Sequence, residues 1–128
     1  MVPVALAGRA TRSLAGKLLP PYQQSLGNPM SYQCLSIDEA KALIDSREVT
    51  LADVRDPQSF LAGNIDNAIN VSDTTVEAFL SATDMDKPLI IYCYHGNSSK
   101  GAAEFFHSKG YAEVYSMDGG YEEWRLKY

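Results

Sequence analysis

The sequence predicts an α/β fold in which a central, mostly parallel sheet of five strands carries helices on both faces. Strand patterns alternate with helix patterns along the chain, and such alternation favours right-handed crossovers between parallel strands. A short apolar run at residues 89–92 follows a proline and is typical of a strand buried on both faces. A chain of 128 residues is long enough for one domain with a single core.

Six elements are expected before this buried strand. In order, they are a strand at 32–35, a helix at 37–46, a strand at 50–54, a helix at 57–61, a strand at 68–71 and a helix at 74–81. Ser36 and Glu39 are spaced as a capping box at the start of the first helix. Asp56-Pro57 ends the second strand and starts the next helix, which Gly63 ends. Apolar residues at helical spacing give the longer helices one face toward the sheet.

Three elements follow the buried strand and its loop. The first is a helix at 99–109, which Gly110 closes as its C-terminal cap. A strand at 113–116 and a helix from Gly120 to about residue 127 complete the domain, and we expect Trp124 to anchor that last helix in the core. The Gly119-Gly120 pair indicates a tight turn before the helix.

Residues 1–29 differ from the rest of the chain. They contain three of the eleven basic residues and none of the sixteen acidic ones. We interpret them as an N-terminal extension, either a leader added ahead of a natural start at Met30 or an acid-poor import presequence. The domain itself is expected over residues 30–128.

Charge and composition exclude several classes of partner. The net charge is −5, and all of the acidic residues lie in the expected domain, which argues against nucleic acid or an anionic membrane as a partner. No apolar run approaches the ~20 residues of a membrane span. Cys34 and Cys93 could form one bridge, but we predict free thiols and a cytoplasmic, reducing location, because a bridge would block the best nucleophile.

That nucleophile is Cys93, which stands between the buried strand and a polar loop. Gly96 and Asn97 give the loop backbone freedom, and Ser98 and Ser99 are residue types that cap helices. Such a strand–loop–helix turn points several backbone N–H groups into one small bowl at the positive end of a helix dipole. A thiol there should ionise more readily than free cysteine. The alternative, an inert buried cysteine, fits composition but not this loop.

Three motifs in order resemble the single-domain rhodaneses, which are thiosulfate sulfurtransferases. The run from Cys93 to Lys100 is similar to the family's active-site loop, residues 51–71 to its first signature and residues 115–124 to its closing signature. Together they cover roughly residues 32–126. The chain departs from the pattern at Gly63-Asn64, where the family usually has Gly-His, and we expect that difference to affect local packing more than chemistry.

The resemblance implies a rhodanese-like fold and a reaction. Cys93 would take the outer sulfur of thiosulfate as a persulfide and pass it to a thiophilic acceptor, cyanide in the laboratory or a dithiol protein such as thioredoxin in the cell. The intermediate is covalent, so we expect no cofactor. We expect a monomer or weak dimer.

The loop residues are expected to serve this intermediate. The amides of Tyr94, His95, Gly96, Asn97, Ser98 and Ser99 could donate to the persulfide, as donors in an oxyanion hole do. Lys100, the fixed positive charge of the loop, could attract a dianionic donor or be a solvated surface lysine. His95 could assist with charge or bond the backbone, and Tyr94 is expected at the rim. Asp53 and Arg55 are expected to pair and brace the loop, although a solvent-exposed turn is the alternative.

Other functions remain open. A non-catalytic binding module on the same scaffold usually lacks the cysteine. A phosphatase or arsenate reductase would carry a longer Cys-x5-Arg loop, whereas Ser99 stands sixth after Cys93 here and no arginine is in the loop. A zinc site formed by Cys34, Cys93, His95 and His107 is disfavoured, because the chain has no Cys-x-x-Cys spacing.

Overall fold

A computed structural model describes residues 32–128, and the expected extension at 1–29 lies outside them. The five strands form one sheet in the order β1-β5-β4-β2-β3, and every neighbouring pair is parallel. The strands are β1 (Gln33–Leu35), β2 (Thr50–Asp53), β3 (Ile69–Asn70), β4 (Leu89–Tyr92) and β5 (Val114–Met117). The predicted five-stranded parallel sheet is confirmed, with β4 at its centre.

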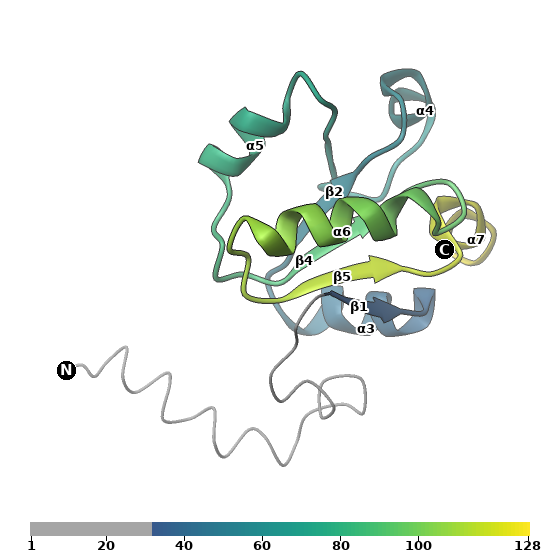
Figure 1. The fold of residues 1–128 in the computed structure, drawn as a ribbon. Helices are drawn as coiled ribbons and strands as arrows, with labels where there is room; N and C mark the ends of the chain where they lie inside the picture. The colour runs from purple at the N-terminus through teal and green to yellow at the C-terminus, as the bar shows by residue number, and fades with distance from the viewer. Residues whose placement is uncertain (1–31) are drawn as a thin grey trace, which may run out of the picture.

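Helices cover both faces of the sheet, as predicted (Figure 1). They are α3 (Ile37–Ser46), α4 (Pro57–Ala62), α5 (Val76–Ala82), α6 (Ser98–Ser108) and α7 (Gly120–Lys127). One core cluster includes Leu43 of α3 and Trp124 of α7, and the other includes Phe79 of α5 and Phe106 of α6. Trp124 is therefore a core residue, as expected.

The position of β4 at the centre of the sheet explains why every one of its side chains is buried. Leu89 and Ile91 of β4 belong to the core cluster under α5 and α6, whereas Ile90 and Tyr92 belong to the cluster under α3 and α7. All four side chains are fully buried. Because successive residues of a strand point to opposite faces, a strand covered on both faces must be apolar at every position.

Most helices and strands begin and end within one or two residues of the predicted positions. Two boundaries that differ have a structural reason. The capping box of α3 is present, with the Glu39 N–H donating to Ser36 Oγ at 3.1 Å. Helix α5 begins at Val76 rather than at residue 74, because Ser72 and Thr75 bond each other in a separate turn. Strand β5 starts at Val114 rather than at 113, and Glu113 instead pairs with Arg47 at 3.0 Å.

The departure at Asn64 has a defined role in the structure. Its side-chain Nδ2 donates to the carbonyl oxygen of Phe60 at 2.8 Å, in the last turn of α4. The free carbonyls of a helix end need donors, and this amide supplies one.

Candidate active site

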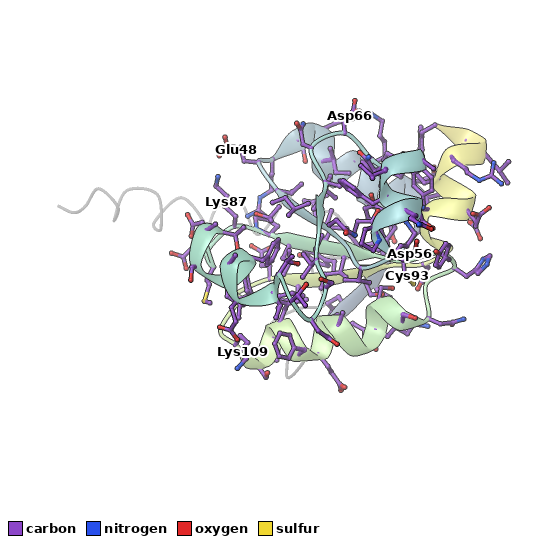
Figure 2. All side chains as sticks on the ribbon, turned by 90° about the horizontal axis from the view of Figure 1, so that it is seen from above. Glu48, Asp56, Asp66, Lys87, Cys93 and Lys109 are labelled. Atoms are coloured by element: carbon purple, nitrogen blue, oxygen red, sulfur yellow. The ribbon has the colours of Figure 1, made fainter. Side chains whose placement is uncertain are left out.

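Cys93 lies at the carboxyl end of β4, the edge of a parallel sheet where ligands bind. Figure 2 shows Cys93 and Asp56 toward one end of the molecule, and Lys87 and Lys109 at the opposite end. The Cys93 side chain is buried and its thiol is free, as is that of Cys34.

Two backbone N–H groups of the loop converge on the sulfur. The Gly96 N–H donates to Cys93 Sγ at 3.2 Å and the Ser99 N–H at 3.3 Å. The Ser99 hydroxyl oxygen lies 3.5 Å from the same sulfur. Gly96 has a φ of 99°, which an L side chain rarely adopts, so glycine allows the loop to turn its amides inward. Two of the six amides predicted to face the sulfur, those of Gly96 and Ser99, therefore donate to it.

These hydrogen-bonding groups lower the pKa of the Cys93 thiol against the effect of burial. Burial by itself would raise the pKa of Cys93, and it is the largest single influence. The Ser99 hydroxyl and the backbone N–H groups of Ser99, Gly96 and His95 together outweigh it, so the pKa of Cys93 is lowered below its usual value. Hydrogen bonds to the charged form favour that form, and the thiolate is the nucleophilic species.

Ser99 turns into the protein instead of capping α6. Asn97 is the N-cap of this helix and makes no side-chain capping bond, so the expectation that Ser98 and Ser99 cap it is wrong. The hydroxyl of Ser99 instead lies 2.8 Å from that of Ser116 in β5. Ser116 was not among the predicted site residues. The sequence offered one signal for Ser116, its place near the carboxyl end of a predicted strand. The structure adds that this strand, β5, lies next to β4.

The turn before α7 holds the catalytic loop by hydrogen bonds between the two backbones. The Tyr121 N–H donates to the Cys93 carbonyl at 2.8 Å, and the Glu122 N–H donates to the Tyr94 carbonyl at 3.1 Å. A Cβ on Gly120 would lie 2.4 Å from the Tyr94 carbonyl oxygen, so only glycine permits this approach. Gly119 and Gly120 also have φ values of 82° and 61°. The expected tight turn is confirmed and is in direct contact with the loop.

Asp53 and Arg55 form a buried ion pair at the same edge of the sheet. Arg55 Nη2 lies 2.7 Å from Asp53 Oδ2, and both side chains are almost fully buried. Arg55 also donates to the Gly63 carbonyl at 2.6 Å and lies 4.3 Å from the ring centroid of Tyr121. Since Tyr121 bonds the Cys93 carbonyl, the pair supports the loop indirectly. The predicted pairing is present, and the exposed-turn alternative is wrong.

Tyr94 forms the rim of the site, where it was expected. Its side chain is 39% exposed, and its hydroxyl bonds the Asp56 carboxylate and lies 2.5 Å from Ser59 Oγ. These bonds tie the loop to the first turn of α4. The Tyr94 hydroxyl, followed by the Ser59 donors, lowers the pKa of Asp56 to about 2. Sequence reasoning did not identify this contact, which joins residues 38 positions apart.

The remaining predicted residues, His95, Asn97, Ser98 and Lys100, have exposed side chains. Lys100 lies near Cys34, where its charge partly offsets the effects of burial and Asp118, which together raise the pKa of that thiol. His95 lies near Glu122, whose pKa is lowered chiefly by Arg125 and in smaller part by His95. Within residues 32–128, the hydrogen bonds of the Cys93 sulfur involve Gly96 and Ser99 and none of these four side chains.

Within residues 32–128, no three His, Cys, Asp or Glu side chains are grouped closely enough to hold a metal ion. Over the same residues, no helix combines the length and apolar character needed to cross a bilayer.

Comparison with known proteins identifies the architecture. The model of the rhodanese-like domain family matches residues 36–127. A rhodanese-related protein from Thermoplasma volcanium has a similar structure, with a TM-score of 0.64 at 28% identity over 75% of this chain and 93% of that one. The human single-domain sulfurtransferase TSTD1 gives a TM-score of 0.65 at 27% identity over 74% of this chain and 96% of that one. A Rhodopseudomonas palustris protein described as a possible tyrosine phosphatase gives 0.64 at 25% identity, over 75% and 81%.

Proposed function

This chain belongs to the rhodanese-like domain family, and we propose that it is a sulfurtransferase whose nucleophile is Cys93. The observation that carries the proposal is the convergence of polar groups on one sulfur: two loop amides donate to it within 3.3 Å, and the Ser99 hydroxyl, 3.5 Å away, can donate once the thiol is ionised. The similarity to a human sulfurtransferase supports the same reaction class. We propose thiosulfate as the donor.

In the first step, the Cys93 thiolate attacks the outer sulfur of thiosulfate. A new S–S bond forms to Cys93, the S–S bond of thiosulfate breaks, and its electron pair leaves with sulfite. The enzyme then carries an anionic persulfide in place of the thiolate. The step uses no general base, because sulfite is a stable leaving group and the lowered pKa of Cys93 favours the thiolate that attacks.

In the second step, an acceptor nucleophile such as cyanide attacks the outer persulfide sulfur. The S–S bond to Cys93 breaks, its electron pair returns to the Cys93 sulfur, and thiocyanate leaves. The loop amides can stabilise the negative charge in both forms, since preorganised donors stabilise an anion without reorganising.

The second candidate is a phosphatase, which the Rhodopseudomonas palustris relative suggests. Phosphate esters are typically gripped bidentately by a guanidinium at the end of a Cys-x5-Arg loop. In this chain Ser99 occupies that position, and its hydroxyl points toward Cys93 and Ser116. The nearby Arg55 is already bound to Asp53 and Gly63. The contacts therefore favour sulfur transfer.

An intact-protein mass spectrum tests the proposal directly. Incubation with thiosulfate should add the mass of one sulfur atom, peptide mapping should place it on Cys93, and cyanide should remove it. Cys93→Ser should abolish the gain and the turnover while leaving the circular dichroism spectrum unchanged, and Cys34→Ser should keep both. No gain by a protein with two free thiols, together with hydrolysis of a generic phosphate ester, would favour the phosphatase; no activity at all would favour a binding module.

A further inference from the structure

A groove of about 410 Å³ lies beside the catalytic loop, between α5 and α6. Its walls are mainly apolar, and they include Val71, Val76, Ala102 and Phe105. Phe105 is 39% exposed, which is high for a phenylalanine that packs against a second ring, that of Phe106. A concave apolar surface of this size is in the range of small-molecule sites.

The groove reaches the loop and the strand end that flank Cys93. Asp53 of β2 is in register with Tyr92 of β4, and the Val54 N–H donates to the Tyr92 carbonyl at 3.0 Å, so Val54 is the lateral neighbour of Cys93. Val54 lines the groove and packs on the same core cluster as Ile91, two residues before Cys93. Ser98, also in the lining, belongs to the catalytic loop. The lining of the groove therefore includes residues that flank Cys93 on the loop and on the neighbouring strand.

The chemistry of the lining disfavours thiosulfate as its occupant. Thiosulfate is a compact dianion with no carbon, so it gains nothing from apolar walls. Among the lining residues that the structure describes, Asp73 alone is charged, and its side chain is exposed and negative. A ligand that fits must have an apolar body and no carboxylate near this end. If thiosulfate supplies the sulfur, the group left to occupy the groove is the acceptor.

We propose that this groove binds the apolar body of a small thiol that accepts sulfur from the Cys93 persulfide. The proposal rests on the sulfurtransferase function proposed above. The acceptor thiolate attacks the outer persulfide sulfur, and a new S–S bond forms on the acceptor. The bond from that sulfur to Cys93 breaks, and its electron pair returns to Cys93 as thiolate. The products are an organic persulfide and the free enzyme, so no external oxidant or reductant is needed.

The first test compares acceptors with and without an apolar body. With the enzyme loaded from thiosulfate, kcat/KM is measured for phenylmethanethiol and for 2-mercaptoethanol, two alkyl thiols. The ratio should favour phenylmethanethiol by roughly tenfold, the usual discrimination of a hydrophobic pocket. Ala102→Phe, which fills the groove, should bring this ratio close to one. Glu104→Phe places the same ring on the exposed face of α6 and should leave the ratio at its original value.

A surface variant tests the groove independently, in case Ala102→Phe does not fold. Asp73→Lys changes one exposed side chain at the groove, and it should improve 3-mercaptopropionate relative to 2-mercaptoethanol about threefold, as expected for one exposed charge. A ratio near one in the unmodified protein, or ratios unmoved by both Ala102→Phe and Asp73→Lys, would overturn the groove as an acceptor site.

A second arm separates this proposal from the sulfurtransferase function. Benzyl and hydroxyethyl methanethiosulfonates both label a thiolate, forming a mixed disulfide and releasing methanesulfinate, without any sulfur transfer. The groove predicts that Cys93 reacts several times faster with the benzyl reagent and that Ala102→Phe removes the preference. If Cys93 shows this preference but is not loaded by thiosulfate, the donor assignment fails and the groove stands. If it is loaded but shows no preference, the groove alone fails.

Discussion

The hydroxyl oxygens of Ser99 and Ser116 lie 2.8 Å apart in the protein interior, and both residues are fully buried. Each hydroxyl has one proton to donate. If Ser116 donates to Ser99, the proton of Ser99 is free to point at the Cys93 sulfur, 3.5 Å away. In that arrangement, which suits the ionised thiol, a residue of β5 orients a donor of the catalytic loop.

This relationship predicts the pH dependence of the two serine variants. The pKa of Cys93 is lowered by the Ser99 hydroxyl among other donors, so Ser99→Ala should raise it and shift the acid limb of the rate profile to higher pH. At pH 6 the variant should alkylate about tenfold more slowly, because a hydrogen bond to a charged group contributes about 1.5 kcal/mol. Ser116→Ala should shift the profile in the same direction by less. Iodoacetamide labelling of Cys93 against pH, mapped by mass spectrometry, measures both. Profiles that coincide with that of the unmodified protein would contradict the hydroxyl chain.

Lys100 is exposed in the first turn of α6, and we predict that it attracts the dianionic donor. Lys100→Ala should raise the KM for thiosulfate roughly threefold, in line with the weak energies of exposed charges, and added salt should reduce the difference. Lys109→Ala is the control, because Lys109 lies at the opposite end of the molecule (Figure 2). Equal KM values for both variants would make Lys100 an ordinary surface residue.

The buried pair of Asp53 and Arg55 should be critical for stability. Asp53→Ala leaves a buried guanidinium without its partner and should lower the free energy of unfolding by about 3–5 kcal/mol. Asp38→Ala breaks an exposed pair with Lys127, 2.8 Å in length, and should leave the free energy of unfolding close to that of the unmodified protein. Urea denaturation at pH 7 measures both. A loss below 1 kcal/mol for Asp53→Ala would show that the pair is dispensable.

Two glycines should respond to alanine in opposite directions. Gly120 has a φ of 61°, and a Cβ there would meet the backbone of Tyr94. Gly120→Ala should cost at least about 2 kcal/mol and disturb the catalytic loop. Gly101 lies within α6 and a Cβ there would meet nothing within 4 Å, so Gly101→Ala should stabilise the protein by about 0.5–1 kcal/mol. Thermal unfolding distinguishes them, and a harmless Gly120→Ala would refute the close approach.

Elements with local sequence signals could be predicted before the structure was known. These signals act within a few residues of the chain. They are the apolar run of β4, the capping box at Ser36 and Glu39, the proline at the start of α4 and Gly96 in the loop. Such signals fixed the position of Cys93 at the end of a buried strand, and the alternation of elements implied the parallel sheet. The donors of Gly96 and Ser99 followed from the same local turn.

Only the tertiary structure decided which distant residues complete the site. Ser116 reaches Ser99 because β5 lies next to β4, Tyr94 meets Asp56 across 38 positions, and Gly120 packs under the loop. It also decided that Ser99 turns inward rather than capping α6. The physical reason is that local patterns specify where a strand or helix begins and ends, whereas contacts between elements depend on strand order and on packing of the two cores against the sheet.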